Sequence, residues 1–365
     1  QAYLNSTAMK KFLKILLIVL FVLFLVILTI PFVFKGEIMK LAKDEINNTV
    51  KAQVDWSDFG ISLFKGFPDL KVTLDNMTVT GIDEFQGDTL VAFDAFSVKV
   101  DLFSAFSGNI KVKSVLLDKP VIRAIAIDSA TVNWDIMYPS DEVIAEEDED
   151  TIASEMDMRI ELREFAIRNA SIRYSDIASD MYAAIENFNF ILSGNLAMDY
   201  TDLDVNTWSD EITVETGGVK YLNKTEFRFK SLLGADLVNN KFTINENELM
   251  LNDIVLGLEG FFNITGDSEY GVDLSYFAKE TSFKSLLSMV PAMYMTDFEG
   301  LETSGSLSLD GTAKGKITDE VMPKVNLNLL VKDGFFSYPD LPKDASDIQI
   351  DLKVFMVKIS YNQKP

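Results

Sequence analysis

The stretch FSVKVDL, from Phe96 to Leu102, alternates apolar and polar residues with a period of two. Successive side chains of a β-strand point to opposite faces of the sheet, so this pattern predicts a strand with one apolar and one polar face. The same alternation recurs after Val54 in Lys71–Asp75, Thr131–Ile136, Met158–Leu162, Phe227–Phe229, Val272–Tyr276 and Val325–Leu329. The chain is therefore expected to be mainly β.

Turn signals such as Phe67-Pro68-Asp69 and Gly217-Gly218 separate these strands at short intervals. Parallel strands need long crossover connections, and these intervals are too short for them. The pattern predicts an elongated, curled antiparallel sheet with few short helices. In three places the apolar alternation shifts by one residue, at Asn76, Asn169 and Asp333, as a β-bulge or tight turn would cause.

An uncharged apolar stretch, ILLIVLFVLFLVILTIPFVF, runs from Ile15 to Phe34. As a helix it would measure about 30 Å, the thickness of the hydrocarbon core of a bilayer. A buried core helix is rarely apolar on every face for this length, and a signal peptide would have a shorter apolar core and a small-residue cleavage site. We therefore expect an uncleaved transmembrane helix. Topology-setting lysines precede it and place the N-terminus in the cytoplasm: Lys10, Lys11 and Lys14.

The net charge of −23 argues against nucleic acid as a partner of the soluble part. The chain contains no cysteine and no histidine, which excludes disulfides, thiol nucleophiles, Ser-His-Asp triads, and histidine-ligated zinc or haem. An enzyme would have to use carboxylates, Lys, Ser/Thr or Tyr. No carboxylate pair stands out as a glycosidase would require, so we expect no enzyme activity and no cofactor or metal site.

The expected organisation follows the composition of the chain. Residues 1–8 precede the plausible initiator Met9 and are set aside as upstream sequence, and 9–34 form the membrane anchor. The next segments are an amphipathic helix leaving the membrane (35–55), a first β-groove segment (56–140), an acidic loop (141–157) and a continuing β-groove segment that looks truncated (158–365). A calcium site in the acidic loop is the alternative, but the ligand spacing and Gly of a calcium loop are absent.

Two amphipathic helices are expected. The first has an apolar face formed by Ile38, Leu41, Ala42, Ile46 and Val50, and either packs on the end of the domain or lies at the membrane interface. The second is expected in the region Ser282–Met295, where its apolar face precedes Pro291, and it should cap the sheet. These helices are too few to cover a long apolar sheet face.

That face must be covered in another way. The sheet either closes on itself as a sandwich or barrel, or it curls into a trough whose apolar lining meets a ligand such as an acyl chain. The alternation assigns each strand residue to one side of the sheet, and the apolar side gives the candidate lining residues. In a closed sandwich they would be ordinary core residues: Val72, Leu74, Val98, Val100, Val132, Trp134, Phe188, Phe190, Phe227 and Phe229.

Several longer stretches resemble the AsmA family of Gram-negative bacteria, especially its Bacteroidetes forms. They include LFKGFPDLKVTLDNMTVTG (Leu63–Gly81), VKVDLFSAFSGNIKVKSVLLDKPVI (Val98–Ile122) and GFFSYPDLPKDASDIQIDL (Gly334–Leu352). The resemblance implies a single-pass inner-membrane anchor, a periplasmic body and a role in outer-membrane biogenesis. Larger relatives such as TamB resemble eukaryotic bridge-like lipid transfer proteins with a repeating β-groove, which favours the trough.

Two functional hypotheses follow. In the first, the apolar groove holds or conducts phospholipid between the inner and the outer membrane, with an outer-membrane component as a possible partner. In the second, the body is a periplasmic scaffold or assembly factor for outer-membrane proteins, with a closed β core and no lipid conduction. Both demand the same alternation, so the sequence does not separate them.

Overall fold

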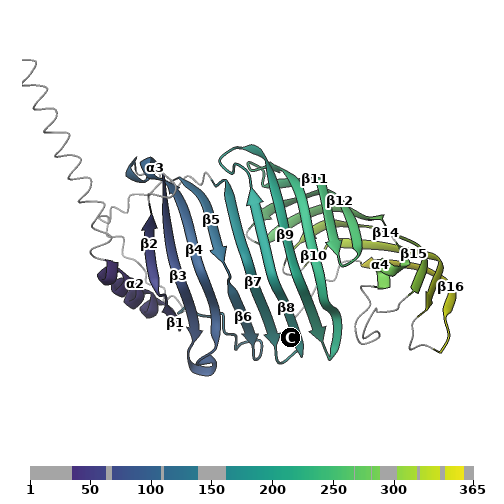
Figure 1. Ribbon diagram of the computed structural model, residues 1–365, viewed down its shortest axis with the longest axis horizontal. Coiled ribbons are helices and arrows are strands. Elements are labelled where there is room, and N and C mark those ends of the chain that lie inside the picture. Colours follow the sequence, from purple (N-terminus) through teal and green to yellow (C-terminus); the bar gives the residue numbers. More distant parts are fainter. Residues whose placement is uncertain are drawn as a thin grey trace, which may run out of the picture.

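The computed structural model describes residues 35–62, 68–107, 111–138, 162–266, 268–280, 282–287, 302–318, 321–337 and 342–356. These residues form one curled 16-stranded sheet with short helices at its margins (Figure 1). The helices are α2 (Lys35–Thr49), η1 (Asp83–Phe85), α3 (Leu102–Ser107) and α4 (Phe283–Leu287). The first strands are β1 (Ala52–Asp55), β2 (Asp58–Ser62), β3 (Asp69–Gly81), β4 (Thr89–Asp101), β5 (Val112–Asp118), β6 (Val121–Ala126), β7 (Glu164–Asp176) and β8 (Met181–Ser193). The remaining strands are β9 (Tyr200–Thr216), β10 (Val219–Asp236), β11 (Lys241–Leu251), β12 (Ile254–Gly266), β13 (Glu269–Glu280), β14 (Glu302–Ile317), β15 (Lys324–Ser337) and β16 (Ala345–Met356).

The strands follow one another across the sheet nearly in chain order, from β1 to β16. Strand β2 pairs with β3, and β6 pairs with β4 and β7 beside β5. Strands β5 and β6 thus form one interrupted strand, broken at Lys119-Pro120, because proline has no N–H to donate to a neighbour. The sheet stays continuous there: Lys119 N donates to Arg168 O at 2.8 Å, and Ser171 N donates to Pro120 O at 2.8 Å.

The prediction of a purely antiparallel sheet is wrong at one place. Strands β5 and β6 both pair with β7 in parallel, and the other pairs are antiparallel. The chain between Ala126 and Glu164 is long enough to return to the starting end of the sheet before β7 begins. The result is a mixed sheet.

The strand predicted at Thr131–Ile136 is also wrong. Only Val132 forms a bridge there, to Ala126. The buried side chain of Asn133 donates to Arg123 O at 2.7 Å and accepts from Ile125 N at 2.9 Å. These bonds fold the segment back on the end of β6 as a turn.

Other predicted elements lie within observed ones. Lys71–Asp75 lies in β3, Phe227–Phe229 in β10, Val272–Tyr276 in β13 and Val325–Leu329 in β15, whereas Phe96–Leu102 begins in β4 and ends at the start of α3. The predicted helix Ser282–Met295 is observed as α4 over its described part. The acidic loop with its calcium alternative, and all of Met158–Leu162 except Leu162, lie outside the described residues.

The predicted shifts at Asn76, Asn169 and Asp333 are confirmed as backbone irregularities within strands. Their φ values are 51°, 53° and 52°, in the left-handed region that Asn and Asp tolerate better than other residues with a side chain. The register between β7 and β8 shifts on both sides of Ala170, next to Asn169, and that between β15 and β16 shifts between Val331 and Gly334.

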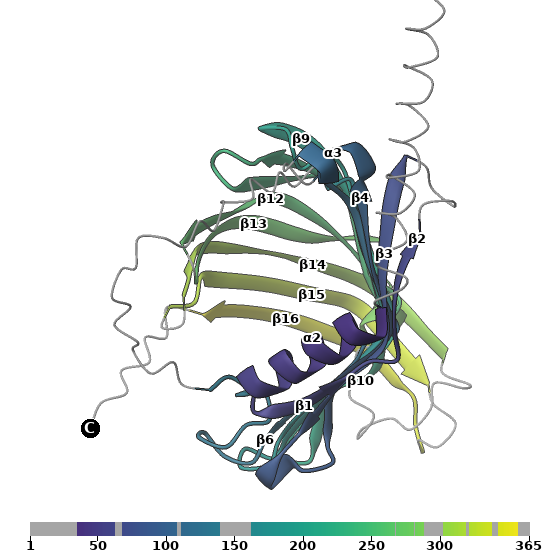
Figure 2. The same ribbon diagram turned by 90° about the vertical axis from the view of Figure 1, so that its left-hand side faces the viewer.

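Left-handed residues follow one another across the first half of the sheet. Asn187 in β8 and Lys224 in β10 each have a φ of 51°, and Lys119 between β5 and β6 has a φ of 48°. We call the line formed by Asn76, Lys119, Asn169, Asn187 and Lys224 the crease. Figure 2 shows the strands of this half bent near mid-length, with α2 on the inside of the bend.

Helix α2 is fixed to β1 by polar contacts. Asn47 Nδ2 donates to Val54 O at 2.9 Å, and Asn47 Oδ1 accepts from Val54 N at 2.7 Å. Lys43 Nζ donates to Asp55 Oδ1 at 2.5 Å and to Trp56 O at 2.7 Å, and its hydrogen bond lowers the pKa of Asp55. The helix therefore packs on the end of the sheet.

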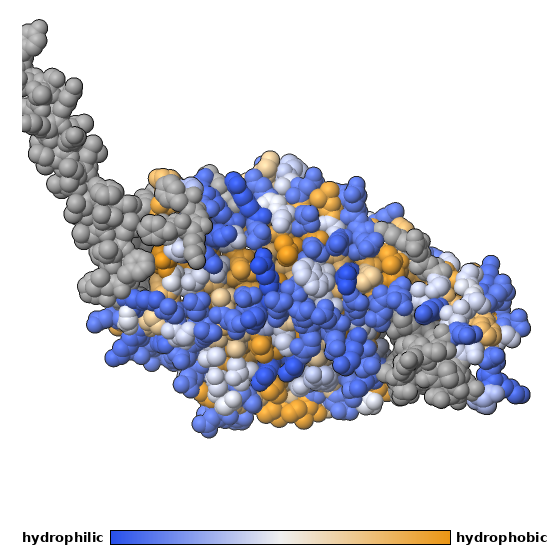
Figure 3. Space-filling model, viewed as in Figure 1, coloured by the Kyte–Doolittle hydropathy of each residue, from blue (hydrophilic) through white to orange (hydrophobic). Residues whose placement is uncertain are grey.

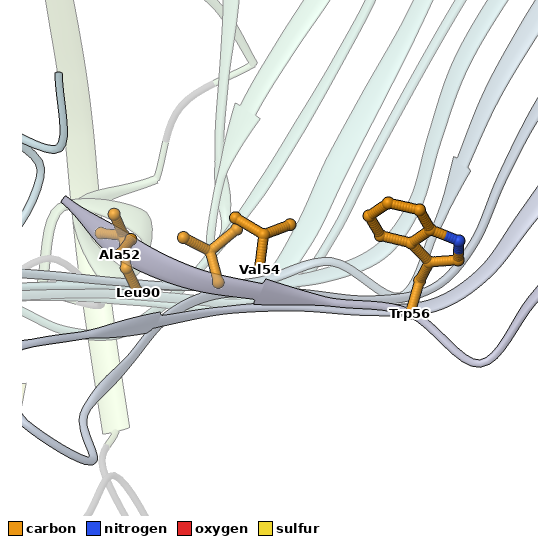
Figure 4. Close-up of a cluster of buried hydrophobic side chains, with 5 residues drawn as sticks. Ala52, Val54, Trp56 and Leu90 are labelled. Carbon is orange, nitrogen blue, oxygen red and sulfur yellow. The ribbon is translucent and has the colours of Figure 1, made fainter. Parts of the chain in front are cut away.

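The predicted apolar face of this helix is wrong in part. Met39 and Ala42 pack against a cluster of buried residues, Ala52, Val54, Trp56, Val79 and Leu90 (Figure 4). Leu41 and Ile46, which the periodicity places on the same face, are 70% and 38% exposed. Hydrogen bonds from Lys43 and Asn47 to β1 and Trp56 set the rotation of the helix instead.

Within the described ranges, which begin at Lys35, no helix is long and apolar enough to cross a membrane. The predicted anchor, Ile15–Phe34, and its flanking lysines lie outside them.

Candidate functional site: the apolar face of the sheet

Strand register identifies one face of the sheet as apolar. Val72 lies opposite Val98, and Leu74 lies opposite Phe96. Directly opposite residues of paired strands point to the same side. Leu74 also packs against the cluster beneath α2. This side, which we call the apolar face, is therefore the concave side that carries α2 (Figure 2).

The same face continues into the middle of the sheet. Phe190 lies opposite Ile167 on β7 and opposite Thr207 on β9, and Thr207 lies opposite Phe229 on β10. The rings of Phe165 and Phe190 pack edge to face, with their centroids 6.0 Å apart. The predicted lining residues that the register places on the apolar face are Val72, Leu74, Val98, Val100, Phe188, Phe190, Phe227 and Phe229.

Val132 and Trp134 lie elsewhere, in the turn after β6. Val132 is half-buried beside Ala126, and Trp134 is 43% exposed. The Trp134 ring lies 6.0 Å from the ring of Tyr174 on β7. These two residues therefore belong to one end of the sheet and do not line a strand.

Sequence reasoning missed other residues of the apolar face. Phe242 on β11 and Phe262 on β12 are directly opposite, with stacked rings 4.9 Å apart. Phe93 shares the face with Phe96, three residues later, because the alternation of β4 slips between them. The alternation of Phe242 and Ile244 would have revealed that Phe242 lies on this face, whereas the shift of the alternation within β4 hides Phe93.

Three buried clusters lie along this face. The first joins α2 to β1, β3 and β4, the second draws on β8 to β12, and the third combines α4 with β14, β15 and β16. In each cluster the described strand residues come from neighbouring strands, supplemented by helices and short loops. A sandwich would bring strands from distant parts of the sheet into one cluster. The clusters instead fit a single open sheet.

Many side chains of this face are only half-buried, including Val98, Phe190 and Phe229. Full burial is reached mainly where a helix or a neighbouring large side chain covers the sheet, as at Val331, which is 0% exposed in the third cluster beside Phe283. Tyr276 is part of this face, and burial raises the pKa of its hydroxyl, which donates to Asn326 O at 2.7 Å. The face can therefore receive apolar groups over most of its width.

The opposite, convex face carries the charged side chains of the strands, and Figure 3 shows hydrophobic areas above and below a hydrophilic band that crosses it. Its groups pair across strands: Lys119 with Asp94 at 2.7 Å, Arg173 with Glu186 at 2.8 Å and Lys224 with Glu211 at 3.2 Å. The hydrogen bond to Asp94 raises the pKa of Lys119, and that to Glu186 raises the pKa of Arg173. We call this side the polar face.

The described residues hold no group of three or more acidic side chains arranged to bind a metal ion. Several of their charged groups form ion pairs across the strands of the polar face. The arrangement is suited to holding apolar ligands.

The sequence model of the AsmA family matches residues 9–259, well over half of the chain. Proteins of this family are generally membrane-associated and belong to the cell envelope, and membership points to a role related to outer-membrane biogenesis or lipid transport. No curated protein and no solved structure matches the chain.

Proposed function

The chain belongs to the AsmA family, and we propose that it is an inner-membrane-anchored periplasmic protein that holds or conducts phospholipid along its apolar face. The observation that carries the proposal is the continuous apolar face of one open sheet, from β3 to β16, without a second layer of strands among the described residues. The outer membrane would be the other end of the route.

The energetics favour acyl chains as the ligand. Each methylene buried against an apolar surface contributes about 0.8 kcal/mol, and an acyl chain has no polar group that would remain unpaired. The phospholipid headgroup would stay at the open side of the curled sheet, in water. A row of half-buried side chains offers many similar positions, as sliding of a chain along the sheet requires.

The test is site-specific photo-crosslinking in a Gram-negative host, with bound lipid identified by mass spectrometry. A crosslinker replaces Val98, on the apolar face, and in a matched variant it replaces Lys99, the exposed neighbour on the polar face. A second pair, Leu309 and Asp310, makes the same comparison at the far half of the sheet.

We expect phospholipid on positions 98 and 309 and none on 99 and 310. Lipid at position 98 alone would support holding near the first strands and contradict conduction along the sheet. Absence of lipid at both apolar positions would refute the proposal and favour a scaffold that assists outer-membrane proteins without carrying lipid.

A further inference from the structure

The polar face has a hollow over β9, β10 and β11. Along β9, Asp204, Asn206, Trp208 and Asp210 alternate with buried residues of the apolar face, so all four point to the polar side. The hollow consists of two adjoining parts, of about 510 and 310 Å³, and these residues line them. Both parts share Asn206 and Lys230.

Register explains why these side chains meet. Asn206 lies directly opposite Lys230, and Lys230 lies directly opposite Glu248 on β11. Trp208 is opposite Arg228. Between Ile244 and Leu249 the pairing of β11 with β12 is irregular, and Glu246 and Glu248 from this irregular stretch form one wall of the larger part of the hollow.

Three polar side chains in the hollow are uncommitted, whereas Arg228 pairs with Glu226 and Asp210 accepts a hydrogen bond from Asn187. Elsewhere on the polar face, charged side chains pair with one another, as Lys119 does with Asp94. In contrast, the side chains of Asp204, Asn206 and Lys230 form no hydrogen bond or ion pair with any residue that the structure describes. Lys230, Asp204 and Glu248 are exposed, so these groups are available to a ligand.

The balance of charge restricts the class of ligand. Arg228 and Lys230 supply two positive charges, against the carboxylates of Asp204, Asp210, Glu246 and Glu248. The excess of carboxylates disfavours phosphate and other anions. Within the described chain no group of three or more acidic side chains is arranged to hold a metal ion. A neutral ligand with many hydroxyl groups fits best, because hydroxyls both donate and accept hydrogen bonds.

We propose that this hollow binds a carbohydrate chain. The Trp208 ring offers a flat apolar surface for the C–H groups of a sugar ring, while Asn206, Lys230 and Asp204 offer hydrogen-bond partners at its edge. From Asp204 to Asp210 the row extends about 20 Å at roughly 3.3 Å per residue, which gives room for several sugar rings. The site lies on the side of the sheet away from the apolar face, so it does not depend on lipid binding.

The test is isothermal titration calorimetry of the detergent-solubilised full chain with chitotetraose, with maltotetraose and, as a basic comparison ligand, with tetralysine. The variants are Trp208→Ala, Lys230→Met, which keeps the length of the side chain, and Asn206→Leu. Trp134→Ala is the matched control, because Trp134 is an exposed tryptophan in the turn after β6, outside the hollow. Circular dichroism confirms that each variant folds.

We expect saturable binding of at least one tetrasaccharide, weakened at least about tenfold by Trp208→Ala and by Lys230→Met, and unchanged by Trp134→Ala. If Trp208→Ala does not fold, Lys230→Met and Asn206→Leu decide the outcome. Absence of saturable binding, or binding that the hollow variants leave unchanged, would overturn the proposal. Binding of tetralysine in place of both sugars would also overturn it, and would assign the hollow to basic peptides.

Discussion

Replacing Asn169 tests whether the crease depends on backbone conformation. Its φ is 53°, and its side chain is exposed and forms no hydrogen bond with any described residue, while its backbone N–H donates to Asn189 Oδ1 at 3.0 Å. The left-handed conformation costs an ordinary L-residue about 1–2 kcal/mol, and β-branched residues are the least tolerant. Asn169→Val should therefore lower the free energy of unfolding by about 1–2 kcal/mol, whereas Asn169→Gly should change it by less than about 0.5 kcal/mol.

The assay is urea denaturation followed by circular dichroism. With an m-value of about 2 kcal/mol/M, the loss for Asn169→Val corresponds to a fall of roughly 0.5–1 M in the urea midpoint. Arg168→Val is the matched control, because Arg168 is exposed and is not among the left-handed residues. If Asn169→Gly destabilises as much as Asn169→Val, or if Arg168→Val costs the same, the backbone argument is refuted.

Two further predictions concern the third cluster and the ion pairs of the polar face. Val331→Ala removes two fully buried methyl groups and should lower the free energy of unfolding, measured by urea denaturation, by about 1.5–3 kcal/mol, while Leu330→Ala, at a partly exposed residue, should cost clearly less. The hydrogen bond from Lys113, at 2.9 Å, holds the pKa of Asp101 below its usual value. Because the folded-state pKa is depressed, the pair stabilises the fold above the unfolded pKa of about 3.9, and this stabilisation is lost as the pH falls through the folded value. The urea midpoint should therefore fall further on acidification from about pH 5 to pH 3 in the wild type than in Lys113→Met, and equal falls would contradict the assignment.

Alternation alone predicted much of the sheet, because a strand with one apolar side has only one face to bury. The side of the sheet on which Val72, Leu74 and Val98 lie follows from the residues next to them in the sequence. The shifts of the alternation at Asn76 and Asn169 follow from the same local pattern. Local sequence also carries the conformational reason for the slips, since Asn tolerates a positive φ.

Long-range contacts decided what the sequence did not show. Thr131–Ile136 alternates as a strand does, but Asn133 bonds the backbone of β6 and makes a turn. Helix α2 exposes Leu41 because Lys43 and Asn47 bond β1 and Trp56. The parallel pairing of β5 with β7 depends on the path of a long connection, which residue periodicity does not encode.

The crease explains how long strands can keep one face apolar while the sheet curls. Strands of 13 to 18 residues, such as β3 and β10, would extend roughly 40–60 Å if straight. In β3, β7, β8 and β10 a left-handed residue bends the strand, and it also shifts the alternation so that apolar side chains on both sides of the bend face inward, as Leu74 and Met77 do around Asn76. The shift leaves polar residues such as Asp75 and Asn76 next to one another on the outside, where they face water and paired side chains. The same backbone feature therefore produces the concavity, its apolar lining and the polar band behind it. A variant that straightens the crease should disturb lipid binding and the outer face together.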